Sequence, residues 1–111
     1  MNISYLALGS NLKTPQRQLH LAIQHLRSLP HTQVLAVAPI YRSKAFGRKA
    51  QPNYCNTVVK ITTTLLPLQL LSLCRKIEKK QGRVRRIKWD ARTLDIDILF
   101  YGTRVICSPA L

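Results

Sequence analysis

The pattern of apolar and polar positions predicts short strands that alternate with amphipathic helices. The apolar run 3–8 ends at a Gly-Ser-Asn turn, which is typical of a buried strand. A helix is expected next, with Thr14 as its N-cap and Pro15 at its first position, and it should close at Pro30. Its buried face is predicted from the i, i+3, i+4, i+7 spacing of Leu19, Ala22, Ile23 and Leu26.

The rest of the chain predicts three further strands and a second helix. Residues 34–41 are rich in β-branched and apolar side chains and predict a strand, and 42–53 predicts a surface loop. From Tyr54 the chain alternates, and one face should carry Cys55, Thr57, Val59 and Ile61. A helix should run from Pro67 to Gly82, with an apolar face of Leu66, Leu70, Leu73 and Ile77.

The last part of the chain predicts a basic loop over 83–91 and a strand over 93–101. A turn at Gly102 and a short returning strand at 105–106 should follow. The order strand, helix, strand, strand, helix, strand predicts an α+β fold of the ferredoxin-like βαββαβ type. Its antiparallel four-stranded sheet should carry two helices on one face. Residues 1–111 are expected to form a single domain.

Charge is the most unusual property of the composition. The net charge is +14, which indicates nucleic acid, an anionic membrane or a polyphosphate as partner. Three cysteines without C-x-x-C spacing predict buried thiols in a reducing compartment, and neither a disulfide framework nor a zinc site. The N-terminus lacks a secretory pattern, and no apolar run approaches the ~20 residues of a membrane span. We therefore expect a cytoplasmic protein without membrane association.

Two of the four acidic residues stand close together in an apolar run, as Asp95 and Asp97. On a strand they share one face, and their Cα atoms lie ~7 Å apart. The opposite, apolar face of this strand should carry Leu94, Ile96, Ile98 and Phe100. The spacing of the two aspartates suits a shared or bridged Mg²⁺, which takes one or two protein carboxylates and completes its shell with water and phosphate oxygens. The alternative is an ordinary polar face on a half-buried strand.

A dense basic stretch precedes this strand, with nine Lys or Arg among the eighteen residues from Arg75 to Arg92. Arginine binds phosphate oxygens in a bidentate way, so the stretch predicts a polyphosphate site. The alternatives are a solvated basic face and a nucleic-acid patch. Trp89, within this stretch, is expected either to stack on a base or to anchor the loop.

A second polar face is predicted on the strand that starts at Tyr54. An Asn side chain offers donors and an acceptor to the edge of a planar heterocycle, and Tyr can stack on its face. Asn56 and Tyr54 share that face, and Ser43 and Phe46 precede them. On its own, this pattern is more often structural.

Together, these segments resemble the 6-hydroxymethyl-7,8-dihydropterin pyrophosphokinase family of folate biosynthesis. The matching motifs run in order along nearly the whole chain. They are Ala7-Leu8-Gly9-Ser10-Asn11-Leu12, Tyr41-Arg42-Ser43, Gln51-Pro52-Asn53-Tyr54-Cys55-Asn56, Ile77-Glu78, Gln81-Gly82-Arg83-Val84-Arg85 and Lys88-Trp89-Asp90-Ala91-Arg92-Thr93-Leu94-Asp95-Ile96-Asp97-Ile98-Leu99.

The resemblance implies transfer of pyrophosphate from ATP to the hydroxymethyl group of the pterin, with release of AMP. It implies that two Mg²⁺ ions are held by Asp95 and Asp97, and that Arg83, Arg92 and Asp97 are catalytic. The implied ATP-binding residues are Glu78, Arg83, Arg85, Lys88, Trp89, Arg92 and Ile98. The implied substrate-binding residues are Ser43, Lys44, Phe46, Tyr54, Asn56 and Asp95.

The chain departs from the family pattern in three places. Asp90 stands where a small residue is common, and Lys44 stands where Pro is common. The chain also stops at Leu111, before the Pro-His and Arg-x-Phe segments of the family. We therefore expect a C-terminally truncated pyrophosphokinase-like domain with ATP and the pterin as small-molecule partners. Its oligomeric state is not predicted.

Two alternatives remain open at this point. One is a truncated, non-catalytic relative of the enzyme. The other is a basic ferredoxin-like module that binds RNA. The central strands lack the aromatic-rich Lys/Arg-Gly-Phe/Tyr pattern of the common RNA-recognition domain, so we do not expect nucleic acid as the partner.

Overall fold

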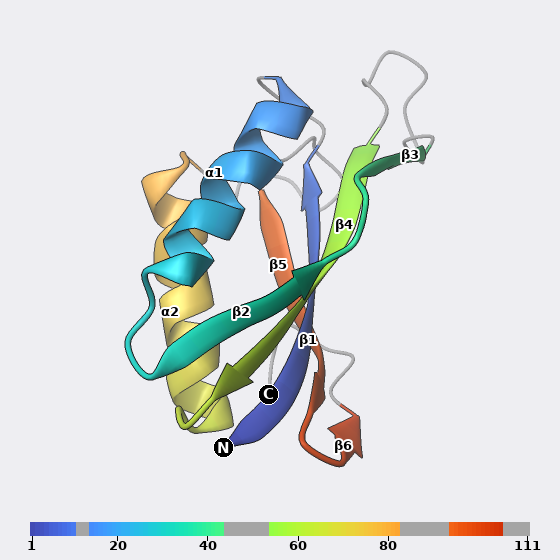
Figure 1. The fold of residues 1–111 in the computed structure, drawn as a ribbon. Coiled ribbons are helices and arrows are strands. Elements are labelled where there is room, and N and C mark those ends of the chain that lie inside the picture. Colours follow the sequence, from blue (N-terminus) through green and yellow to red (C-terminus); the bar gives the residue numbers. More distant parts are fainter. Residues whose placement is uncertain (11–13, 44–53, 83–93, 106–111) are drawn as a thin grey trace.

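The computed structural model describes residues 1–10, 14–43, 54–82 and 94–105, and within them the chain forms two helices and an antiparallel sheet of six strands. In chain order the elements are β1 (Asn2–Ser10), α1 (Pro15–Arg27), β2 (Thr32–Val37), β3 (Tyr41–Ser43), β4 (Tyr54–Thr63), α2 (Pro67–Lys80), β5 (Asp95–Tyr101) and β6 (Arg104–Val105). The strand order is β2-β4-β1-β5-β6, and β3 also pairs with β4. Both helices cover one face of the sheet (Figure 1). This confirms the predicted α+β fold.

The strand predicted over 34–41 is divided into β2 and β3. The pairing of β2 with β4 shifts register between Val34 and Ala36, and Pro39 follows without a backbone N–H to donate. The chain then pairs with β4 again, where Ser43 lies opposite Tyr54. The prediction that Ser43 belongs to the surface loop was therefore wrong.

The predicted buried face of α1 is confirmed. Leu19, Ala22, Ile23 and Leu26 are all buried against the sheet. Thr14 is the N-cap residue, as predicted, but it has a φ of 55° and its side chain makes no capping hydrogen bond. Pro15, whose fixed φ suits the first helical position, follows it directly.

The buried face of α2 is rotated from the predicted one. Leu66 is the N-cap residue and is 63% exposed, so it is not part of the core. Its backbone N–H donates to Oε1 of Gln69 at 2.9 Å. The buried positions are instead Leu70, Cys74, Ile77 and Glu78. Counted from Leu70, they follow the i, i+4, i+7, i+8 spacing of one helical face.

β5 alternates as predicted only up to its bulge. Leu94, Ile96 and Ile98 are buried beneath the helices, but Phe100 is 43% exposed and Tyr101 is buried in its place. The pairing of β1 with β5 shifts register between Tyr5 and Leu6. Because one extra residue in a strand reverses the direction of every later side chain, the prediction that Phe100 faces the core was wrong.

Two further expectations concern the thiols and the membrane. Cys55 and Cys74 are buried and free, as predicted, while Cys107 lies outside the described residues. In the described segments, neither helix has the length and apolar character needed to cross a membrane. The returning strand is found as β6, one residue earlier than predicted.

Candidate functional site

The candidate site lies on the outer face of the sheet, the face opposite the two helices. Gly9 of the central strand β1 pairs with Asn56 of β4 on one side and with Asp95 of β5 on the other. Directly paired residues in antiparallel strands point to the same face, so the amide and the carboxylate project from one row. The structure thus brings together two residues that are 39 positions apart in the sequence.

The next row extends this arrangement along the strands. Ala7 lies between Val58 and Asp97, so both aspartates are on the outer face beside the small residues Gly9 and Ala7. One further row on, the large ring of Tyr5 stands against Phe100, with ring centroids 6.1 Å apart. The small residues Gly9 and Ala7 of the central strand therefore leave space between the polar side chains. The rings of Tyr5 and Phe100 border this space at one end.

The two aspartates have the chemistry of a magnesium site. Both side chains are partly exposed, and they alternate with the buried Ile96 on β5. Within 1–10, 14–43, 54–82 and 94–105, no group of three or more His, Cys, Asp or Glu side chains could hold a metal ion. Mg²⁺ needs only one or two protein carboxylates when water and phosphate oxygens supply the other ligands. The pair therefore fits a cation that arrives with a polyphosphate.

Glu78, predicted to lie near the nucleotide, is on the helix side of β5. Its side chain is buried, and Oε2 accepts a hydrogen bond from the backbone N–H of Ile96 at 2.7 Å. The same oxygen accepts a hydrogen bond from Nη1 of Arg75 at 2.5 Å. A buried carboxylate is tolerated when it is paired and hydrogen-bonded in this way. Glu78 therefore contacts β5, the strand that carries both aspartates, from the helix side of the sheet.

Arg75 was not singled out by the sequence, although its i, i+3 spacing from Glu78 is that of a helical ion pair. Besides Glu78, Nη1 donates to the backbone carbonyl oxygen of Ile96 at 3.0 Å. Cys74 lies next to it in the core, where burial raises the pKa of the thiol to about 12. The thiol is therefore protonated at neutral pH and is no nucleophile.

Other predicted site residues are placed only in part. Ser43 and Tyr54 form a backbone pair between β3 and β4, next to the row that contains Asn56. The side chain of Ile98 is buried in the core, so a nucleotide could contact this residue only through its main chain. The remaining predicted residues lie outside the described part of the chain: Lys44, Phe46, Arg83, Arg85, Lys88, Trp89 and Arg92.

Tyr41 is a second residue that the sequence prediction did not place in the site. It pairs with Asn56 in the β3–β4 ladder, and its side chain is 58% exposed. An aromatic ring beside an amide on an open face can contact a planar ligand. The signal in the sequence was its position just before Arg42-Ser43, within a motif shared with the family.

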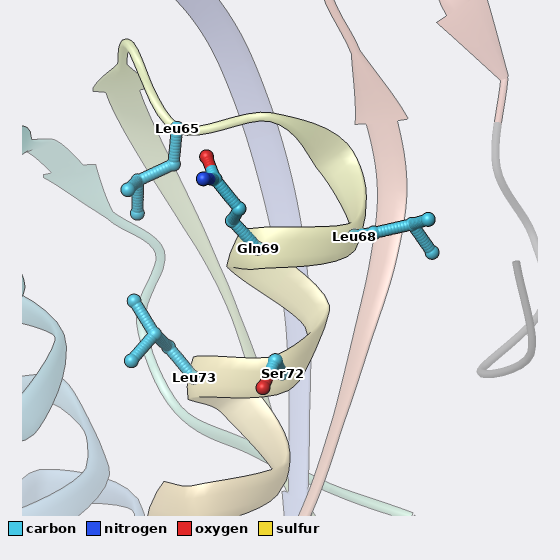
Figure 2. Close-up of a pocket in the computed structure, with 5 residues that line it drawn as sticks. All are labelled: Leu65, Leu68, Gln69, Ser72 and Leu73. Carbon is cyan, nitrogen blue, oxygen red and sulfur yellow. The ribbon is translucent and has the colours of Figure 1, made fainter.

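A hollow elsewhere on the molecule is not part of this site. It has a volume of about 440 Å³ and is lined by Leu65, Leu68, Gln69, Ser72 and Leu73 around the start of α2 (Figure 2). The first turn of α2 follows the end of β4, whereas Asn56 is near its beginning. The hollow and the candidate site are thus at opposite ends of the sheet (Figure 1).

Known proteins resemble this chain over nearly its whole length. The family described as 7,8-dihydro-6-hydroxymethylpterin-pyrophosphokinase (HPPK) matches residues 5–110. A Haemophilus influenzae protein named 2-amino-4-hydroxy-6-hydroxymethyldihydropteridine pyrophosphokinase is 48% identical over 111 residues, which are 100% of this chain and 69% of that protein. The protein of the same name from Pseudomonas aeruginosa is 44% identical over 96% of this chain and 66% of its own length.

A third relative of the same name, from Pseudomonas putida, is 41% identical over 97% of this chain and 89% of its own length. The chain therefore spans about two thirds of the length of the first two relatives and most of the third. The relatives carry the name of a pyrophosphokinase, and nothing in these comparisons favours an RNA-binding module. The chain belongs to the 7,8-dihydro-6-hydroxymethylpterin-pyrophosphokinase family.

Proposed function

We propose that this chain transfers the pyrophosphoryl group of ATP to the hydroxymethyl group of 6-hydroxymethyl-7,8-dihydropterin, giving the pterin diphosphate and AMP. The observation that carries the proposal is the row in which Gly9 separates Asn56 from Asp95. The amide of Asn56 can form hydrogen bonds with the edge of a heterocycle, and the carboxylate of Asp95 can bind a cation. Only Gly9 lies between them in the sheet. A substrate with a planar ring and a nearby hydroxyl would span them.

The pterin end of the site is assigned to residues of β3, β4 and the segment between them. The amide of Asn56 would donate to and accept from the ring edge, which has both kinds of partner. Tyr54 would pack on one ring face, with Ser43, Lys44 and Phe46 around the ring. Support comes from the pairing of Ser43 with Tyr54 in the row next to Asn56.

The metal end is assigned to Asp95 and Asp97, which would hold two Mg²⁺ ions together with the phosphates of ATP. When bound, such ions neutralise phosphate charge and orient the reacting oxygens. The two carboxylates hold this charge on a paired strand, so little reorganisation is needed during the reaction. Asp95 would also lie beside the substrate hydroxyl, since it shares the row with Asn56.

The phosphate charge that the metal ions do not neutralise is assigned to the basic segment before β5. Arg83 and Arg92 would bind phosphate oxygens in a bidentate way as charge develops on them. Arg85, Lys88 and Trp89 would help to exclude water, and the main chain of Ile98 would border the nucleotide. Glu78 is buried on the core side of β5, so it would act on the ATP site through that strand and not by direct contact. The net charge of +14 supports an anionic substrate.

The proposed reaction uses two small molecules, and we place it in the cytoplasm. Residues 1–111 would act as one pyrophosphokinase-like domain. To test the proposed function, the chain is incubated with ATP, Mg²⁺ and the hydroxymethyl pterin, and the products are then separated. We expect equal amounts of AMP and pterin diphosphate, and no AMP when the pterin is left out.

The product ratio also separates this proposal from other reactions. ADP with a pterin monophosphate would indicate an ordinary kinase. AMP formation that does not need the pterin would indicate a hydrolase. A folded chain that gives no AMP would be a non-catalytic relative, and the proposal would be wrong.

A further inference from the structure

We propose that Arg75 and Glu78 act as a pair of positioning residues, which set the spacing of Asp95 and Asp97 through the main chain of Ile96. This inference rests on the proposed function, because it assigns the two aspartates to the metal. It adds a role on the helix side of the sheet to a site that lies on the outer face.

The geometry is a closed ring of three hydrogen bonds. Oε2 of Glu78 accepts from the N–H of Ile96 at 2.7 Å, and Nη1 of Arg75 donates to the carbonyl oxygen of Ile96 at 3.0 Å. The ring closes where Nη1 of Arg75 donates to Oε2 of Glu78 at 2.5 Å. Two side chains of α2 thus satisfy both polar backbone groups of a single residue of β5.

The ring substitutes for a neighbouring strand. β5 pairs with β1 along one edge, while on the other edge the described residues of β6 pair with Phe100 and Tyr101 alone. Around Ile96 a backbone N–H and a carbonyl on the other edge would otherwise need a partner. A carboxylate and a guanidinium offer one acceptor and one donor, and charge-assisted hydrogen bonds are roughly twice as strong as neutral ones.

Each bond fixes one of the two peptide planes that adjoin the aspartates. The N–H of Ile96 belongs to the plane shared with Asp95, and its carbonyl belongs to the plane shared with Asp97. Because a peptide is planar, holding its N–H or C=O fixes the position of the adjoining Cα atom and restrains the direction of its Cα–Cβ bond. The hydrogen bonds to Ile96 therefore orient the two carboxylates through the backbone of β5.

Burial favours this role over direct contact with the nucleotide. The side chain of Glu78 is only 1% exposed and lies on the core side of β5. To reach a ligand on the outer face, it would have to leave Ile96 and Arg75 in the core without their partner. Partners that orient metal ligands in this indirect way typically change metal affinity by about 10–100-fold when they are removed.

The test compares Arg75→Met with Lys79→Met in this chain. Lys79 is an exposed residue of the same helix, so both variants lose one positive charge, but only the first breaks the ring. Mn²⁺ is titrated by electron paramagnetic resonance in the presence of α,β-methylene-ATP, whose α–β linkage cannot be cleaved. Hydrogen exchange of the Ile96 amide is followed by NMR in the same samples.

We expect Arg75→Met and Glu78→Ala to weaken Mn²⁺ binding about tenfold or more and to speed exchange of the Ile96 amide. Arg75→Lys keeps a donor and should recover most of the affinity, and Lys79→Met should match the unaltered chain. Binding of the analogue without metal should not change. If Glu78→Ala does not fold, Arg75→Met carries the test, because its side chain is partly exposed.

Two results would overturn the inference. One is unchanged Mn²⁺ affinity in Arg75→Met while Asp97→Asn loses it, which leaves the proposed function standing. The other is an equal loss of metal-free nucleotide binding, which would make the pair a direct nucleotide contact. If Asp97→Asn itself keeps full Mn²⁺ affinity, the aspartates do not hold the metal and the proposed function fails.

Discussion

Asn56 and Asp95 lie on opposite sides of Gly9, because β4 and β5 both pair with β1 at that residue. Neighbouring strands are ~4.8 Å apart, so the two Cα atoms are separated by ~10 Å. This span fits a ligand with a flat ring at one end and a reactive hydroxyl at the other. The space between the side chains of Asn56 and Asp95 is open, since Gly9 has no side chain.

Asn56→Ala should weaken binding of the pterin while leaving that of ATP nearly unchanged. The amide would make hydrogen bonds to the ring edge, and their loss leaves polar groups of the ligand unpaired. We expect the KM for the pterin to rise about 10–100-fold, as measured by initial rates at saturating ATP.

Thr62→Ala is the matched control for that change. Thr62 lies on the same face of β4, near the opposite end of the strand, where it pairs with Ile3. It should leave both KM values unchanged. Equal effects of the two variants, or a larger effect of Asn56→Ala on ATP than on the pterin, would show that Asn56 does not read the ring.

Tyr101→Phe should destabilise the fold without altering the outer face. The buried hydroxyl of Tyr101 donates a hydrogen bond to the carbonyl oxygen of Leu65, which joins β5 to the start of α2. Removing the hydroxyl leaves that buried acceptor without this donor, at a cost of about 1–3 kcal/mol. Urea unfolding measures the change.

Tyr5→Phe is the control for Tyr101→Phe, because it removes a hydroxyl from a tyrosine on the outer face. Tyr5 is only partly buried, and its ring contact with Phe100 does not need the hydroxyl. We expect its free energy of unfolding to stay within about 0.5 kcal/mol of the unaltered chain. A loss in Tyr101→Phe no larger than this would contradict the assigned hydrogen bond.

The buried thiol of Cys74 should make the fold less stable in alkaline solution. Burial raises its pKa from 9.0 to about 12, so above pH 9 the unfolded chain loses this proton while the folded chain keeps it. The unfolded state then binds fewer protons, and the free energy of unfolding falls as pH rises from about 9 towards 12.

Cys74→Ala removes this contribution, and urea unfolding at several pH values from 8 to about 11 compares the two chains. The variant should be less stable at pH 8, because it leaves a small cavity, but its stability should fall less steeply with pH. Parallel pH curves for the two chains would show that the thiol does not ionise differently in the folded state.

Periodicity predicted the elements well where each segment has one apolar face. The spacing of Leu19, Ala22, Ile23 and Leu26 gave the core face of α1, and strand alternation placed Asp95 and Asp97 together on one side. Both are local properties of 3.6-residue and two-residue repeats. The register that places Asn56 in the same row as Asp95 depends on pairing with a third strand, which no local pattern contains.

The wrong predictions have a common cause in tertiary structure. The bulge beside Leu6 turns Phe100 outward, and no turn residue marks it in the sequence. Leu66 continues the helical spacing but lies before the helix, where it is solvated. Likewise, the spacing of Arg75 and Glu78 indicates an ion pair, whereas their common partner is the main chain of a distant strand.

The most direct measurement is the Mg²⁺-dependent rate of AMP formation from ATP and the hydroxymethyl pterin, in the unaltered chain, Asp95→Asn and Asp97→Asn. The substitution keeps the shape of each side chain and removes one negative charge from a partly exposed position, so the thermal unfolding midpoint should change little. We predict a rate at least about 100-fold lower in each variant, and loss of activity when the metal is chelated. AMP formation that persists in both variants at the rate of the unaltered chain would contradict the account.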